Sequence, residues 1–182
     1  MRKNLELRTL IVLALLTAIG AVFKAFISFD LFFGGMKISD LSLIALPVML
    51  AGIYYGPLAG GLVGFVSEMA SFFMMPVGAY NPAFSAVMAL YGVIAGLFFM
   101  KSQKTGLLKT LIMVTLSELI CSAVLTTLLI HVFYSVPLAV LLPSRSVGVL
   151  IKIPVLTALV MIIAERLRPV VNSHRRMAPA EK

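Results

Sequence analysis

The chain has 182 residues, of which 61% are hydrophobic and 12% are charged. Soluble domains are about half apolar and a quarter charged, so this composition argues against a water-soluble enzyme. It also excludes a disordered chain, which needs low hydrophobicity and many charges. The formal net charge of +8 points first to basic cytoplasmic loops of a membrane protein rather than to nucleic-acid binding.

Six apolar segments follow one another along the chain. A helix that crosses the hydrocarbon core of a membrane needs about 20 mostly apolar residues. The strands of a β-barrel would alternate apolar and polar residues, which these segments do not. We therefore expect an all-α integral membrane protein, a bundle of six transmembrane helices in a single domain over residues 1–182. The expected spans are 9–29, 41–55, 58–75, 82–100, 107–134 and 146–167.

Turn residues and polar residues separate these spans. Tyr55-Gly56-Pro57 predicts a tight turn, because glycine adopts unusual dihedral angles and proline cannot continue a preceding helix. Residues 75–82 predict an ordered loop, residues 101–105 are polar and basic, and residues 135–144 predict a last outer loop with two prolines. Residues 171–182 are expected to form a basic cytoplasmic tail.

The positions of the basic residues predict the orientation in the membrane. With a cytoplasmic N-terminus and six crossings, 11 of the 15 lysines and arginines fall on the cytoplasmic side, as the positive-inside rule favours. Both termini are then cytoplasmic. The four basic residues that remain in or beyond the outer half of the membrane are Lys24, Lys37, Arg145 and Lys152.

These four cations are candidate ligand-binding residues. A lysine or arginine at the centre of a bilayer costs about 2.5 to 3.5 kcal/mol to insert, so such a charge usually faces protein, water or a ligand. Arg145 is expected to end the last outer loop, and Lys152 follows it by two helical turns on the same face. Cations that converge at an outward mouth would attract an anion. Alternatively, Lys24 and Arg145 extend to the membrane surface and Lys37 is simply solvated.

Glu68 lies near the middle of the third span, where an unpaired carboxylate would be costly. Three interpretations stay open: an ion pair with Lys24 or Lys152, a neutral carboxyl group, or a carboxylate that accepts hydrogen bonds from a ligand. Lys24 and Glu68 are also the one candidate pair for the polar cluster that a small integral membrane enzyme would need.

Small residues recur at helical spacing in three of the spans. Ala14 and Ala18 form a flat strip on the first span, which Ala21 and Ala25 extend. Such a strip lets a second helix approach closely, and close packing is the main source of helix association in lipid. Similar strips are formed by Gly60, Gly61 and Gly64 on the third span and by Gly92 and Gly96 on the fourth.

Several catalytic and cofactor motifs are missing from the sequence. It has no Gly-x-x-x-x-Gly-Lys-Ser/Thr loop for ATP and no His-Glu-x-x-His or Gly-x-Ser-x-Gly motif. Cys121 is the only cysteine, and His131 and His174 are far apart. We therefore expect no metal site and no cofactor bound by this chain, and active transport would require partner subunits.

The chain resembles the substrate-binding (S) subunits of energy-coupling factor (ECF) transporters, most closely the folate-type branch. The six-span size and Ala14-x-x-x-Ala18 are typical of the family, as is the run from Leu46-Pro47-Val48 through Tyr55-Gly56-Pro57 to Gly60-Gly61. The segments similar to the folate-type branch are Pro76-Val77-Gly78-Ala79-Tyr80-Asn81-Pro82-Ala83-Phe84-Ser85, 91–99, Phe133-Tyr134-Ser135-Val136-Pro137, Leu142-Pro143-Ser144-Arg145 and Lys152-Ile153-Pro154.

This resemblance implies a high-affinity vitamin-binding subunit in a bacterial cell membrane, with folate as the favoured ligand. The subunit would hand its substrate inward with a separate coupling subunit and two ATPases, which use the ATP. The Ala14/Ala18 strip would dock the coupling subunit, and the outer loops would close over the ligand. The expected ligand-binding residues are Lys24, Phe32, Lys37, Glu68, Tyr80, Asn81, Phe84, Arg145 and Lys152.

Other functions stay open. The vitamin could instead be pantothenate, riboflavin or thiamine. From other classes of protein, a small integral membrane enzyme would use Lys24 and Glu68, whereas a structural or assembly subunit would leave these two charged residues hard to explain.

Overall fold

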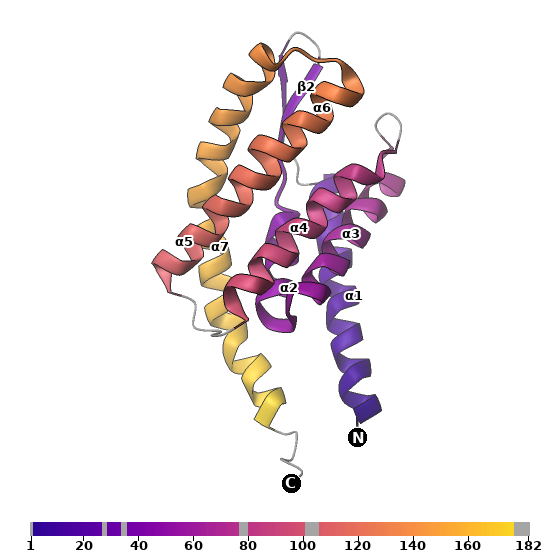
Figure 1. The fold of residues 1–182 in the computed structure, drawn as a ribbon. Coiled ribbons are helices and arrows are strands. Elements are labelled where there is room, and N and C mark those ends of the chain that lie inside the picture. Colours follow the sequence, from indigo (N-terminus) through magenta and orange to yellow (C-terminus); the bar gives the residue numbers. More distant parts are fainter. Residues whose placement is uncertain (1, 27–28, 34–35, 77–79, 101–105, 177–182) are drawn as a thin grey trace.

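The computed structural model describes residues 2–26, 29–33, 36–76, 80–100 and 106–176. Its helices lie side by side in one bundle, and both chain termini lie at the same end of it (Figure 1). The predicted all-α class is confirmed. The elements are α1 (Arg2–Phe26), β1 (Phe29–Phe33), β2 (Met36–Leu41), α2 (Ala45–Tyr55), α3 (Pro57–Met74), α4 (Pro82–Phe99), α5 (Leu107–Ser117), the π-helix η1 (Glu118–Thr126), α6 (Thr127–Tyr134) and α7 (Leu138–Arg176).

Within the described residues, five helical stretches are long and apolar enough to cross a membrane, and α2 is a shorter sixth. Helices α5, η1 and α6 form one continuous stretch over Leu107–Tyr134. The eleven residues of α2 are too few to span the hydrocarbon core alone. Its residues Ala45–Tyr54 are all buried, so α2 is enclosed by the longer helices and contacts protein on all sides.

A short antiparallel hairpin replaces the end of the first expected span. Helix α1 ends at Phe26, and β1 pairs with β2 so that Phe29 lies opposite Leu41. The hairpin lies at the end of the bundle away from the termini, here named the hairpin end (Figure 1). Strand β2 packs against α7, so the hairpin connects the α1 side of the bundle to the α7 side.

Glycine and proline define the helix boundaries in the middle of the chain. Gly56 has a φ of +93° between α2 and α3, a conformation that glycine adopts without a steric penalty. Pro57 follows as the first residue of α3, where the missing backbone N–H is not needed. The predicted Tyr55-Gly56-Pro57 turn is therefore confirmed. At the start of α4, the Asn81 side chain accepts a hydrogen bond from the Ala83 N–H at 3.0 Å, and Pro82 follows it.

The last expected loop is shorter than predicted. Helix α7 begins at Leu138 and includes Pro143, so the prediction of a loop over residues 135–144 was wrong. A proline is tolerated inside a transmembrane helix because neighbouring groups satisfy the backbone atoms that it frees. Helix α7 continues to Arg176, into the expected tail, and at 39 residues it is about 58 Å long. It therefore exceeds the thickness of a bilayer including its headgroups, which is about 40 to 45 Å.

Helices α2, α3 and α4 meet at a contact of three glycines. A Cβ atom added to Gly92 would lie 2.8 Å from the Gly60 Cα, and one added to Gly60 would lie 2.7 Å from the Gly52 Cα. No real Cβ fits at these distances, so the backbones touch directly. This is the close packing that holds helices together in lipid.

Gly92→Ala is expected to destabilise the bundle, although alanine is normally better than glycine inside a helix by about 1 kcal/mol. The added methyl group would meet the Gly60 backbone, which cannot move aside as a flexible side chain can, and such overpacking costs about 1 to 3 kcal/mol. Thermal unfolding of the purified protein in detergent should show a lower Tm. Gly106→Ala is the control, because a Cβ there meets no atom within 4 Å. Equal Tm values for the two variants would contradict a tight contact.

Candidate functional site

An ion pair joins α1 to α3 near the hairpin end. The Lys24 Nζ donates a hydrogen bond to the Glu68 Oε1, and the two side chains are 25% and 10% exposed. Of the alternatives that the sequence leaves open for Glu68, pairing with Lys24 is the one observed. Glu68 lies six residues before the end of α3, a depth of about 9 Å along the helix.

The contact between α1 and α3 brings this pair together. Gly20 allows close approach, since a Cβ there would lie 3.2 Å from the Ser67 Cβ. The Ser67 hydroxyl then donates to the Thr17 carbonyl at 3.2 Å. Lys24 follows Gly20 by four residues, about one helical turn, and Glu68 follows Ser67 directly. The small residue therefore determines where the two charges meet.

Aromatic rings lie at and above the level of the ion pair. The antiparallel helices α3 and α4 place Gly60 beside Gly92, and a Cβ on Gly64 would lie 2.8 Å from the Met88 carbonyl carbon. Four further residues along each helix, this register puts Glu68 level with Phe84. Another four residues on, Phe72 and Tyr80 are in contact, with ring centroids 5.1 Å apart.

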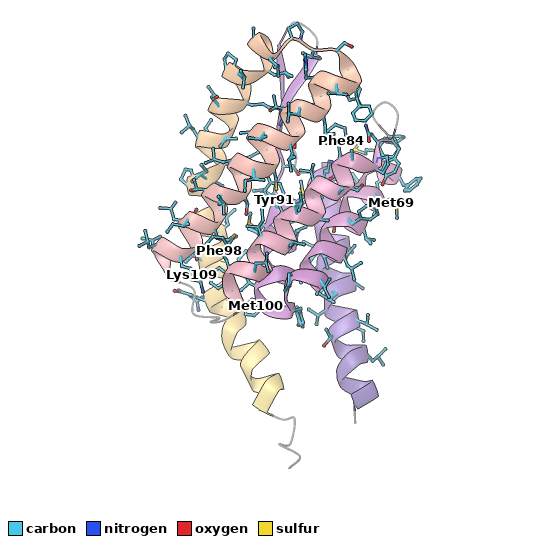
Figure 2. The ribbon with its side chains drawn as sticks, in the orientation of Figure 1. Met69, Phe84, Tyr91, Phe98, Met100 and Lys109 are labelled. Carbon is cyan, nitrogen blue, oxygen red and sulfur yellow. The ribbon has the colours of Figure 1, made fainter. Side chains whose placement is uncertain are left out.

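Tyr80 and Asn81 directly precede α4, and Phe84 lies in its first turn. The Tyr80 hydroxyl is 2.9 Å from the Ser85 Oγ, and the Tyr80 ring also stacks at 6.3 Å on Phe73. Asn81 caps the helix, and the Phe84 N–H donates to the Asn81 carbonyl at 3.2 Å. Phe84 lies near the upper end of α4, with Tyr91 further down (Figure 2). Sequence reasoning missed Phe72 and Phe73, although Phe72 follows Glu68 by one helical turn.

Arg145 and Lys152 form a second group on α7. Arg145 is 6% exposed, and its Nη1 donates to the Ser122 carbonyl in η1 at 3.3 Å. The prediction that Arg145 ends a loop was wrong, because it lies two turns inside α7. Lys152 is half-buried two turns further along the same helix.

The π-helix η1 presents the Ser122 carbonyl to Arg145. The Thr127 hydroxyl donates to the Ser122 carbonyl at 3.4 Å, and the Thr126 hydroxyl donates to the Cys121 carbonyl at 2.6 Å. Both contacts join residues five apart, the spacing of a π-helix. The Ser122 carbonyl therefore accepts from Thr127 and from Arg145.

The remaining predicted ligand residues lie on connections at the hairpin end. Phe32 pairs with Lys37 across the hairpin. In the loop expected over 75–82, residues 77–79 lie outside the described part of the chain. In the ranges that the structure describes, His, Cys, Asp and Glu side chains form no group of three or more that could hold a metal ion.

The Ala14/Ala18 strip faces outward from the bundle. Both alanines are exposed, whereas Ala21 is buried, so the strip does not continue through Ala21 as the sequence suggested. Only 11% of the α1 span is buried, against 33% to 39% of the other four long spans. Large apolar side chains beside the strip, among them Leu10, Ile11 and Leu15, are about 60% exposed. Helix α1 lies at the edge of the bundle (Figure 1).

Comparisons with known proteins find one family. A family model for the substrate-specific component of ECF transporters matches residues 8–164. The folate transporter FolT of Clostridium novyi (strain NT) is 25% identical over 150 residues, which are 82% of this chain and 84% of that protein. The fold is similar to that of a crystal structure of FolT bound with folic acid, with a TM-score of 0.76, 22% identity and coverage of 86% of this chain and 92% of that chain.

Proposed function

We propose that this chain, which belongs to the substrate-specific components of the ECF transporters, binds folate and delivers it inward across a bacterial membrane. The family is a transporter component and not an enzyme, and this multi-pass membrane protein shares that role. Folate is proposed because a folate transporter is 25% identical over 82% of the chain. The same fold also accommodates folic acid in a solved structure.

The observation that carries the proposal is a lysine with an acidic partner beside aromatic rings. Folate joins a flat pterin ring to a glutamate tail with two carboxylates, so a site for it needs ring contacts and cations. Phe72, Tyr80 and Phe84 lie at or above the level of Glu68, and aromatic faces stack well on a flat heterocycle. Lys24 supplies a cation at that level.

In this proposal the hairpin end faces the outside of the cell and both termini are cytoplasmic. The positive-inside rule favours this orientation. Phe32 and Lys37 on the hairpin and Asn81 at the start of α4 would then lie at the outer mouth of the site. Arg145 and Lys152 on α7 would lie on another side of the same outer mouth. Arg145 would bind a carboxylate of the ligand by donating two parallel hydrogen bonds.

The energy for transport would come from other chains. The sequence has no phosphate-binding loop for ATP, so two partner ATPases would hydrolyse ATP and a coupling subunit would transmit the change. The exposed Ala14 and Ala18 would form the docking face for the coupling subunit, because a flat strip permits close approach of its helices.

Arg145→Ala and Lys24→Ala should each weaken folate binding. Removing one member of a buried charge pair typically costs about 2 to 5 kcal/mol, or roughly 30-fold to several thousand-fold in affinity. If Arg145 holds the glutamate tail, its variant should lose little affinity for pteroate, which lacks that tail. Isothermal titration calorimetry of the purified protein with both ligands measures the difference.

Arg166→Ala is the matched control for this titration. Arg166 lies on the same helix as Arg145, but it is exposed and lies in the C-terminal half of α7, away from the hairpin end. This variant should therefore bind folate like the wild type. Wild-type affinity in both the Arg145 and Lys24 variants would disprove the proposed anion site.

Ala14→Trp and Ala18→Trp should abolish assembly with the coupling subunit and leave folate affinity unchanged. The indole ring would fill the flat strip on α1 without touching the ion pair. Copurification with the coupling subunit and ATPases tests assembly, and titration of the isolated chain tests binding. Ala158→Trp, at an exposed position of α7, is the control that should still assemble. Normal copurification of the two α1 variants would place the docking face elsewhere.

A further inference from the structure

The Glu68 carboxylate uses only one of its two oxygens within the described structure. Its Oε1 accepts from Lys24, whereas its Oε2 is buried and has no hydrogen-bond partner among the described residues. A buried carboxylate oxygen without a donor bears the full cost of losing its water. Glu68 bears this cost inside a helix that is long and apolar enough to cross a membrane, about 9 Å from the end of that helix.

Lys24 alone does not explain a carboxylate at this position. One oxygen is sufficient for the ion pair, and the Ser71 hydroxyl, which could reach the same turn, donates instead to the Glu68 backbone carbonyl at 2.7 Å. Phe72 follows Glu68 by four residues, about one helical turn towards the hairpin end, and its ring contacts Tyr80. The second oxygen is therefore an acceptor at the depth where the aromatic rings begin.

We propose that Glu68 Oε2 accepts a hydrogen bond from an amino group on the heteroaromatic ring of the ligand and thereby determines specificity. This inference rests on the proposed binding of folate and names the part of folate that Glu68 recognises. An ionised carboxylate only accepts hydrogen bonds, so it selects a ring edge with N–H donors and disfavours one with carbonyl oxygens or methyl groups. The pterin ring has such an edge, with an amino group beside a ring N–H.

The arrangement separates two tasks within one ion pair. Lys24 donates to Oε1 and so orients the carboxylate. Oε2 then accepts the hydrogen bond from the amino group of the ring. A site that accepts a hydrogen bond from a ligand's N–H group rejects an analogue without that group, because the buried acceptor of the protein is then left unpaired.

Two ligands and three variants test this inference. The ligands are folate and 2-desamino-2-methylfolate, in which a methyl group replaces the amino group. The wild-type chain in detergent should bind the analogue about 10- to 100-fold more weakly, as expected for one charge-assisted hydrogen bond. Glu68→Met has no acceptor, so the ratio of the two dissociation constants should fall to near one.

Lys24→Met is the matched control, because it removes the cation but keeps Glu68. Both ligands should bind more weakly to it, yet the ratio between them should persist. If Glu68→Met leaves the half-buried Lys24 without a counter-ion and fails to fold, Lys24→Met/Glu68→Met removes both charges together, which is far less disruptive. That double variant should also show a ratio near one.

The outcomes separate this inference from the proposed function. Equal wild-type affinities for the two ligands would overturn the role of Glu68 while leaving folate binding intact. An unchanged ratio in Glu68→Met, or in the double variant, would show that another group reads the amino group. Failure of the wild type to bind either ligand would overturn the folate proposal and this inference together.

Discussion

The direct backbone contact of Gly52, Gly60 and Gly92 is the constraint on which the rest of this structure depends. Helices in lipid gain little from the hydrophobic effect, so they associate by close packing. Because α3 and α4 touch at Gly60 and Gly92, their register is determined over their whole length. The same register brings Phe72 to Tyr80 and places Glu68 level with Phe84. The glycines therefore position the candidate site about two to three turns away.

Charges near the hairpin end are distributed unevenly between the two sides of the bundle. Lys24 and Glu68 form a pair with no net charge, which lowers the cost of both groups inside the membrane. Such a pair orients a ligand more than it attracts one from a distance. Arg145 on α7 is buried and bonds a carbonyl of η1, so it adds a cation whose guanidinium keeps its charge at any physiological pH.

Much of the fold could be predicted from the sequence, because long apolar runs and the Gly56-Pro57 turn are local signals. The hairpin was missed because its strands are short and lie between apolar segments. The Gly34-Gly35 pair between them is the sequence signal for a two-residue hairpin loop. The two prolines in residues 135–144 predict a loop that Arg145 ends, but the rule that proline breaks a helix weakens inside a membrane, and α7 includes both Pro143 and Arg145.

The candidate site was predictable only in part. The charge pattern singled out Lys24 and Glu68, and a pair between them was one of several options. Phe72 and Phe73 carry no motif, and only packing against Tyr80 reveals them.

The central claim, that the chain is a folate-binding component, is tested most directly by identifying what the protein retains from cells. The full chain is purified in detergent and then denatured, and the small molecules that it releases are analysed by mass spectrometry. This measurement gives both the identity of the retained molecule and its stoichiometry. The account predicts a folate at close to one molecule per chain. Retention of pantothenate, riboflavin or thiamine at that stoichiometry instead would contradict it.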